Sequence, residues 1–309
     1  MSYAVLFPGQ GSQAVGMGGD VFRARPDLLA AARRVLGWDL ELVCREGPEE
    51  ELTRTERAQP ALYTVAFALW EALAERLRTL PAGAAGHSLG EYNALSAAGV
   101  LGFEEGLRLV AARGEAMAAA AAAVPSGMAA LVGADVSEAE HLVAACGVAG
   151  GRLWIANVNA PGQVVVAGGL DDLAWAEAHA REHGVRRVIV LKVAGAFHTP
   201  LMSPAAPRLE AALAAAAFGP ARFPVWANST AAPYERDPGP LLLRQLTAPV
   251  RFGASLGAMA NAGMRRFVHI GPGDVTAGLA RRSVEGAETL VVSRLDEVDA
   301  AAAALDAAA

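Results

Sequence analysis

The chain has 309 residues, of which 53% are hydrophobic and 19% charged, and its formal net charge is −6. A disordered chain would show the opposite balance, and an acidic chain offers no global positive field to nucleic acid or to a membrane surface. The length suits one large α/β domain, or a large domain that carries a smaller one.

The first part of the chain alternates between strand and helix patterns. The second long helix is expected to open at Gln59-Pro60, because proline is tolerated best in the first turn of a helix. The expected elements are a strand at 3–7, helices at 27–36 and 60–78, a short run of small residues at 82–87, and helices at 89–98 and 103–123.

The pattern changes after Pro125-Ser-Gly127 to the order β-α-β-β-α-β, which is that of a ferredoxin-like unit. We therefore predict a ferredoxin-like small domain at 125–195, inserted into a large α/β domain made of 1–124 and 196–309. The expected elements of the insertion are a strand at 128–133, a helix at 137–145, strands at 153–159 and 163–167, a helix at 171–183 and a strand at 186–193.

Beyond Gly195 the alternation of the large domain returns, which implies a mainly parallel sheet covered on both faces. The Ala-rich tail from Ala300 is low in complexity and is expected to be a frayed helix. The expected elements are a strand at 223–228, helices near 239–246 and 252–262, a strand at 266–270, a helix at 274–282 and a strand at 289–293.

Residue usage limits the compartment and the chemistry. The two cysteines, Cys44 and Cys146, form no CxxC or metal-like spacing, which favours a reduced, cytoplasmic protein. The first residues show no basic segment of a signal peptide, and no apolar run is long enough to span a bilayer. Lys192 is the only lysine, so a P-loop is excluded and a pyridoxal Schiff base is unconvincing.

The strongest motif is Gly86-His-Ser88-Leu-Gly90, which matches G-x-S-x-G with a strand before it and a helix after it. A tight turn of this kind needs its glycines and presents the serine hydroxyl at the helix N-terminus. Backbone N–H groups there, led by that of Leu89, can stabilise an oxyanion. Ser88 is therefore the candidate nucleophile.

Six histidines compete for the role of base. His87 adjoins the serine and should point away from its hydroxyl, and three others fall on helices of the insertion. His269, in a strand, reads as a buried structural histidine. His198 lies in the irregular segment Ala194-Gly-Ala-Phe-His-Thr-Pro200, where the insertion rejoins the large domain, and scaffolded loops are where catalytic groups gather.

Two further motifs have weaker interpretations. His179-Ala-Arg-Glu-His183 resembles the H-x-x-E-H zinc signature, but a surface helix explains it better, and we predict no metal site. Gly9-Gln-Gly-Ser-Gln-Ala14 mimics the dinucleotide pattern without the acidic residue that the ribose requires. The alternative is a tight glycine loop that brings the N–H of Gln10 beside the serine.

Arg113 flanks the apolar face of the helix at 103–123 and has no acidic residue at i±4. An unpaired arginine facing inward is costly unless an anion meets it. From the helical wheel alone, a bound anion and a distant salt bridge are equally good explanations.

Taken together, these features resemble the malonyl-CoA:acyl carrier protein transacylases and the acyltransferase domains of polyketide synthases. The resemblance runs from Phe7 to about Leu295, and no departure occurs at the catalytic positions. It is carried by Phe7-Pro-Gly-Gln-Gly-Ser-Gln13, Gln59-Pro-Ala61, Gly86-His-Ser-Leu-Gly-Glu-Tyr92, Arg113-Gly114, Ala196-Phe-His198, Gln245-Leu-Thr-Ala-Pro-Val250 and Gly271-Pro-Gly273.

The resemblance implies a hydrolase-like large domain and a ping-pong malonyl transfer from malonyl-CoA to the phosphopantetheine thiol of acyl carrier protein. Ser88 would be the nucleophile and His198 the base, and Gln245 would orient His198 through its backbone carbonyl. The N–H groups of Gln10 and Leu89 would form the oxyanion hole.

For the substrate, the resemblance implies that Arg113 holds the malonyl carboxylate, with Met117 and Phe197 nearby, and Ala-Phe-His is the version of that segment associated with malonyl units. It favours a monomer without a tightly bound cofactor. Because carrier proteins of this family are acidic, docking needs a local basic patch. The candidate patches are Arg186-Arg187, Arg265-Arg266 and Arg281-Arg282.

Two rival functions remain open on the sequence. A serine thioesterase or other hydrolase would use water as acceptor, and it would need a carboxylate between Ser88 and His198 to orient the base. The only candidates that we weighed for that role, Asp135, Asp171 and Asp172, lie in the insertion. A non-catalytic protein that binds a dinucleotide at Gly9–Ala14 is the other rival.

Overall fold

A computed structural model describes residues 2–307. Its larger sheet has five parallel strands in the order β7-β2-β1-β8-β9. Side chains of the central strand alternate between two cores: Tyr3, Val5 and Phe7 belong to one, and Ala4 and Leu6 to the other. The sheet is therefore buried on both faces, as parallel sheets are. The strands are β1 (Tyr3–Phe7), β2 (Gly83–Gly86), β7 (Val225–Trp226), β8 (Arg266–Ile270) and β9 (Glu288–Val292).

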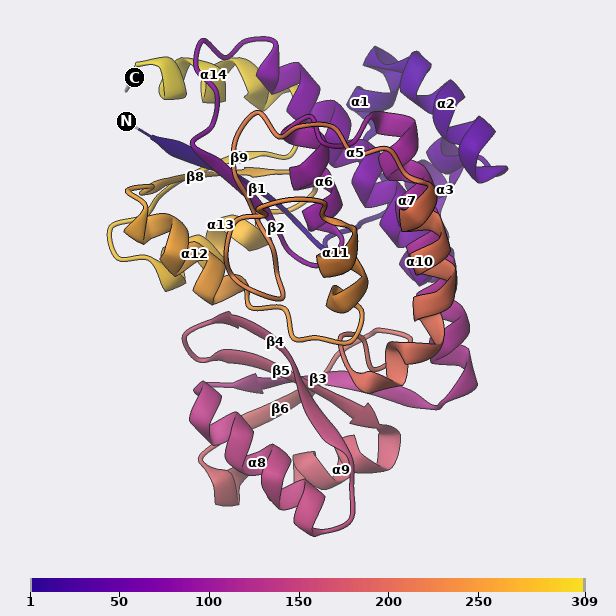
Figure 1. The fold of residues 1–309 in the computed structure, drawn as a ribbon, viewed down its shortest axis with the longest axis vertical. Helices are drawn as coiled ribbons and strands as arrows, with labels where there is room; N and C mark the ends of the chain where they lie inside the picture. Colours follow the sequence, from indigo (N-terminus) through magenta and orange to yellow (C-terminus); the bar gives the residue numbers. More distant parts are fainter. Residues whose placement is uncertain (1, 308–309) are drawn as a thin grey trace.

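Helices cover both faces of this sheet (Figure 1). The smaller core is covered by α12 (Phe252–Asn261) and α13 (Val275–Ser283). The helices that share the main core are α1 (Gly19–Ala24), α2 (Pro26–Leu36), α3 (Leu40–Glu46), α4 (Glu49–Thr53), α5 (Thr55–Ala74), α6 (Gly90–Ala97), α7 (Phe103–Ala123), α10 (Ala206–Ala215), α11 (Gly239–Gln245) and α14 (Val298–Asp306), with short 3-10 turns at Pro200–Ala205 and Leu295–Glu297.

The second sheet is antiparallel, with the order β4-β5-β3-β6. Two helices cover one of its faces, and the β-α-β-β-α-β order is the ferredoxin-like one that the sequence predicted (Figure 1). The predicted fold class, α/β with a mainly parallel sheet and an added ferredoxin-like unit, is thereby confirmed. The elements are β3 (Ser126–Val132), α8 (Val136–Val148), β4 (Leu153–Ala160), β5 (Gln163–Gly169), α9 (Leu170–His179) with a 3-10 turn at Ala180–His183, and β6 (Arg187–Val190).

The other face of the antiparallel sheet belongs to the main core, to which Met128, Val165 and Ala167 contribute. Strand β4 also exchanges hydrogen bonds with Val250: Val158 N donates to the Val250 carbonyl at 2.8 Å, and Val250 N donates to the Ala156 carbonyl at 2.9 Å. Because the two sheets share a core and backbone pairing, the division at 125 and 195 into separate domains stays a prediction.

Several predicted elements were wrong in extent. Helix α5 begins at Thr55, so Pro60 lies inside it; burial of Thr55, Ala58 and Gln59 outweighs the hydrogen bond that the proline removes. The strand predicted at 223–228 shrinks to Val225–Trp226, and the one predicted at 186–193 to Arg187–Val190. Sequence patterns also missed α1, α3, α4 and α10.

The Ala-rich tail was also predicted wrongly, because α14 is a packed helix rather than a frayed one. Val298, Ala301, Ala302 and Leu305 are buried at one-turn spacing against the main core. Ala308 and Ala309 lie outside the described residues. No helix within residues 2–307 is both long and apolar enough to cross a membrane.

Candidate active site

Ser88 sits at the sharp turn between β2 and α6. Its φ is +51°, a left-handed conformation that is rare outside glycine. A Cβ on Gly86 would lie 1.9 Å from the Gly90 carbonyl, and a Cβ on Gly90 would lie 2.3 Å from the Phe7 carbonyl oxygen. Both flanking positions therefore require glycine, which is why the motif has this composition.

His198 reaches Ser88 from the segment that follows the antiparallel sheet. Its Nε2 lies 2.8 Å from Ser88 Oγ, and its Nδ1 lies 2.8 Å from the backbone carbonyl of Gln245. A carbonyl can only accept, so Nδ1 carries the proton and Nε2 is free to accept the serine proton. Burial, helped by the positive charge of Arg113, lowers the pKa of His198 to about 3. The imidazole is therefore neutral around pH 7.

The Gln245 side chain forms hydrogen bonds with Ser88, Glu91 and Arg113. Its Nε2 donates to the Ser88 carbonyl at 3.0 Å and to the carboxylate of Glu91, while its Oε1 accepts from Arg113 Nη2 at 2.8 Å. The backbone carbonyl of the same residue holds the imidazole. Gln245, at the end of α11, thus contacts the backbone of Ser88, the imidazole of His198 and the guanidinium of Arg113.

Arg113 is fully buried on α7, and its guanidinium contacts Ser88. Its Nη2 donates to Ser88 Oγ at 2.9 Å, and its Nη1 donates to Gln59 Oε1 at 2.7 Å. Within residues 2–307, no carboxylate forms an ion pair with it and its Nε has no hydrogen-bond partner. Burial lowers the pKa of Arg113, and the nearby Tyr92 and Glu91 only partly oppose this effect. The distant salt bridge considered from the sequence is absent among these residues.

Met117 and Phe197, the other two predicted substrate-binding residues, are both buried. Met117 follows Arg113 by one turn of α7, and its sulfur lies 3.6 Å from the Gln59 amide nitrogen, which places Gln59 between the two. Phe197 directly precedes His198. Both side chains belong to the main core, so they also help to fix the arginine and the histidine in place.

Gln10 and Leu89 bring two unused backbone N–H groups toward the elbow. The loop after β1 lies against it, since a Cβ on Gly9 would be 2.6 Å from the His87 carbonyl oxygen. Neither the Gln10 nor the Leu89 N–H has an acceptor in the described part of the chain. The Ser88 N–H, by contrast, donates to Asn228 Oδ1 at 2.7 Å.

Sequence reasoning missed four contributors to this network. Gln59 and Glu91 stood inside motifs that carried the family resemblance, but no role was assigned to them. Asn228 bridges the elbow by accepting from Ser88 N and donating to the Gly86 carbonyl at 2.7 Å. Asn159 of β4 holds His87 at 2.7 Å, so His87 turns away from the serine, as predicted.

The zinc-like motif at 179–183 and the glycine loop at 9–14 have other roles in the structure. His179 bonds the Trp175 carbonyl and stacks on its indole, and no group of metal-ligating side chains gathers within the range 2–307. The glycine loop at 9–14 packs on the elbow, whereas a dinucleotide motif would lead straight into a helix, and α1 starts only at Gly19.

The hydrolase alternative would need a carboxylate on His198, and among the described residues none of its three candidates bonds this histidine. Asp135 caps α8, and Asp172 accepts from the Arg152 and Gly169 N–H groups. The Nδ1 of His198 bonds a carbonyl rather than a carboxylate. His198 is therefore oriented by a backbone carbonyl and not by an acidic third residue.

A serine hydroxyl that bonds a neutral imidazole at a strand-to-helix elbow defines an α/β enzyme equipped for acyl chemistry on serine. A family model described as acyl transferase domain matches residues 5–297. The chain therefore belongs to the acyl transferase family, and it is an acyltransferase.

Individual relatives agree with this family. The malonyl CoA-acyl carrier protein transacylase of Bacillus subtilis is 39% identical over 303 residues, 96% of this chain and 95% of that protein. The polyketide biosynthesis protein ThaF of Burkholderia thailandensis is 41% identical over 281 residues, 91% of this chain but only 24% of ThaF. A solved structure described as a type II polyketide synthase acyl-carrier protein in complex with its malonyl-transacylase matches with a TM-score of 0.91, at 36% identity, over 98% of this chain and 100% of the other.

Proposed function

We propose that this enzyme transfers the malonyl group from malonyl-CoA to the phosphopantetheine thiol of acyl carrier protein. The relatives with this name span nearly the whole chain, and one related structure is a complex with a carrier protein. The proposed roles are those that the sequence suggested: Ser88 as nucleophile, His198 as base and Gln245 as the residue that holds the base.

The observation that carries the proposal is the contact between Arg113 and Ser88. A buried guanidinium without an ion-pair partner in the described residues lies 2.9 Å from the oxygen that would carry the acyl group. Burying an unpaired charge is costly, so a site of this kind suits a substrate that brings its own carboxylate. Malonyl has that carboxylate two bonds from the thioester carbonyl carbon, and acetyl does not.

In the first half-reaction, Ser88 Oγ attacks the thioester carbonyl and His198 Nε2 takes its proton. The N–H groups of Gln10 and Leu89 receive the oxyanion. The C–S bond then breaks, the CoA sulfur takes the proton from His198, and malonyl remains as an ester on Ser88. In the second half-reaction, the carrier thiol gives its proton to His198, attacks the ester, and the proton returns to Ser88 as the C–O bond breaks.

For carrier docking we propose the exposed pair Arg186-Arg187. Arg187 is the first residue of β6, which lies at the edge of the antiparallel sheet. Neither arginine has an ion-pair partner among the residues described, so both are free to meet an acidic protein. In the two other pairs considered from the sequence, Arg266 forms an ion pair with Glu288 at 2.6 Å, and Arg281 donates a hydrogen bond to the Thr289 hydroxyl at 2.7 Å. Arg187→Glu should raise KM for the carrier protein and leave KM for malonyl-CoA unchanged.

The proposal is tested by intact mass spectrometry after brief mixing with malonyl-CoA, in parallel with acetyl-CoA and with the Ser88→Ala variant. A malonyl adduct that needs Ser88 and disappears when carrier protein is added is the expected result. Steady CoA release without a carrier would instead indicate a hydrolase. No reaction with malonyl-CoA would overturn the proposal.

A further inference from the structure

Glu91 lies in the first turn of α6, just after the elbow, and the residue is 1% exposed. Three donors surround it: the Asn228 N–H at 3.1 Å, the Gln245 amide, and the hydroxyl of Tyr234. Three donors on one carboxylate favour its charged form, whereas burial favours its neutral form. Glu91 is therefore poised between the two states.

Glu91 is also the one acidic group joined to Arg113 among the described residues. The amide of Gln245 bridges them, since its Oε1 accepts from Arg113 and its Nε2 donates to Glu91. In this buried network the free enzyme balances one guanidinium against one relayed carboxylate. A substrate carboxylate on Arg113 would put two negative charges against one positive charge.

We propose that Glu91 is a proton-linked counter-ion for Arg113: it offsets the guanidinium in the free enzyme and takes up one proton when the carboxylate of the acyl group binds Arg113. This inference rests on the proposed function, because it assumes a malonyl-like substrate. Glu91 acts through Gln245 and Arg113, so it is a positioning residue that sets specificity, and it does not touch the acyl group.

The ionisation of the neighbouring groups fits this assignment. Burial raises the pKa of Glu91 to about 7, against the opposing effect of the three donors and of Arg113. Burial raises the pKa values of the neighbouring Tyr92 and Tyr234, which therefore stay protonated. Burial lowers the pKa of Arg113, but from a strongly basic starting value, and it lowers the pKa of His198 to about 3. Between pH 6 and 9, Glu91 is the member of this cluster that titrates.

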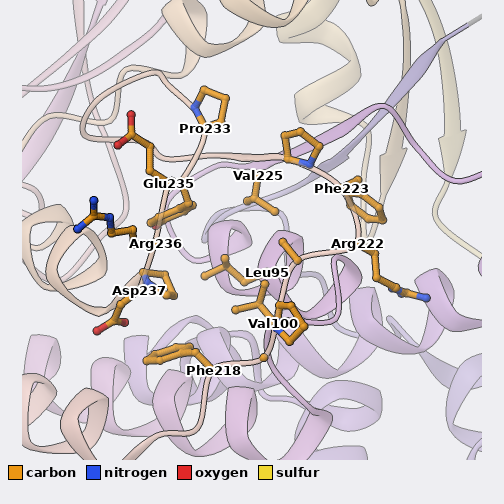
Figure 2. Close-up of a pocket in the computed structure, with 16 residues that line it drawn as sticks. Leu95, Val100, Phe218, Arg222, Phe223, Val225, Pro233, Glu235, Arg236 and Asp237 are labelled. Atoms are coloured by element: carbon orange, nitrogen blue, oxygen red, sulfur yellow. The ribbon is translucent and has the colours of Figure 1, made fainter.

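A cleft of about 780 Å³ lies next to this cluster (Figure 2). Tyr234 lines this cleft, and its hydroxyl donates a hydrogen bond to Glu91. Apolar side chains such as Leu95, Val100 and Phe223 line its interior, and Arg222 and Arg236 lie along it in Figure 2. The proposal therefore routes the proton to Glu91 through Tyr234, the residue between the cleft and the carboxylate.

The sign of the pH dependence follows from these pKa values. Below pH 7, Glu91 is already protonated, and the site accepts a second carboxylate without taking up a proton. Above pH 7, binding of a malonyl group is coupled to the uptake of one proton from solution by Glu91. The apparent affinity for the malonyl group therefore falls by up to about tenfold per pH unit. Acetyl-CoA brings no carboxylate and should show no such dependence.

The test uses the Ser88→Ala variant of the full chain, which can bind malonyl-CoA but cannot form the ester. Calorimetry in two buffers of different ionisation enthalpy should count about one proton taken up on binding at pH 8 and close to none at pH 5.5. The same protein with Glu91→Gln should take up none at either pH, because glutamine mimics the protonated acid. Proton uptake that persists in the double variant, or none at pH 8 in Ser88→Ala alone, overturns the proposal.

Kinetics of the first half-reaction provide a second readout in the chain with Ser88 intact. KM for malonyl-CoA should rise above pH 7 while kcat stays level, and Glu91→Gln should abolish the rise. Tyr234→Phe removes a donor that stabilises the charged form of Glu91, so the rise in KM should begin at a higher pH. The control Glu285→Gln, at an exposed position, should leave the pH dependence of KM unchanged. Tyr234→Phe decides the question if Glu91→Gln does not fold. A level KM in an enzyme that still forms malonyl-Ser88 refutes this inference alone, whereas absence of the adduct refutes the proposed function.

Discussion

Arg113 donates a hydrogen bond to the hydroxyl of Ser88 at 2.9 Å, across 25 positions of sequence. The contact places a buried positive charge beside the oxygen that would carry the acyl group. An acyl chain bearing a carboxylate can form a direct ion pair with this guanidinium, while a neutral chain leaves it without one. Under the proposed function, selectivity for the acyl group is linked to the position of one guanidinium.

Arg113→Ala should lose malonyl transfer by at least about a hundredfold, because a buried charge-assisted pair is worth about 3 kcal/mol. Relative use of acetyl-CoA should increase, since the unpaired charge that penalises it is gone. The measurement is kcat/KM for both thioesters. Arg108→Ala, an exposed arginine on the same helix, serves as control. An equal loss with both thioesters would argue against a carboxylate-binding role.

Gln245→Ala should slow the acylation of Ser88 by malonyl-CoA and by acetyl-CoA by about tenfold to a hundredfold. This range matches the loss of charged hydrogen bonds to Arg113 and Glu91. The bond that holds His198 uses the backbone carbonyl, which alanine retains. A single-turnover assay of Ser88 acylation measures the effect, with His198→Ala as the reference for loss of the base. If the two variants were equally inactive, the glutamine side chain itself would be essential for orienting the histidine.

Gly86→Ala should destabilise the protein by about 3 kcal/mol or more, because its Cβ would overlap the Gly90 carbonyl. Gly257→Ala is the matched control: Gly257 lies inside α12, and a Cβ there meets nothing within 4 Å. It should stabilise the protein by about 0.8 kcal/mol through helix propensity. Urea denaturation of both variants checks the pair, and a tolerated Gly86→Ala would contradict the geometry of the elbow.

His198 should make the protein sensitive to acid. The pKa of His198 is lowered to about 3 in the folded state, while an unfolded histidine titrates near pH 6.5. Between these values the unfolded state binds one more proton, so this residue lowers stability by about 1.4 kcal/mol for each pH unit as the pH falls. The burial of Glu91 acts in the opposite direction between pH 4.5 and 7, because its folded pKa is raised.

The contribution of His198 is therefore read as a difference between proteins. Urea denaturation at pH 4.5 and 5.5 should show a smaller loss of stability for His198→Gln than for the unchanged chain, by about 1.4 kcal/mol. Identical pH slopes would show that the histidine is protonated in the folded state.

Local patterns predicted the two sheets, and they located Ser88 and His198 as candidates, because the elbow and its flanking elements are encoded in neighbouring residues. Local patterns failed where packing decides. Pro60 was placed at a helix start although buried neighbours extend α5 beyond it, and α14 was judged frayed although one face is buried.

The supporting network of the site could not be predicted, because its bonds join distant positions. Arg113 meets Gln59 across 54 residues and Gln245 across 132, and Gln245 meets Glu91 across 154. The sequence shows each partner as a polar residue in a helix. Only the tertiary fold shows which acceptor each donor finds.

The pairing of β4 with Val250 has a consequence for engineering by domain exchange. Ala156 and Val158 hold the segment that follows Gln245, and Asn159 of the same strand holds His87. A chimera that replaced the ferredoxin-like unit with one from another enzyme would therefore need a compatible strand edge and an asparagine at this position. A graft chosen only for its outer surface would shift both anchors of the proposed catalytic pair, even though neither Ser88 nor His198 had been exchanged.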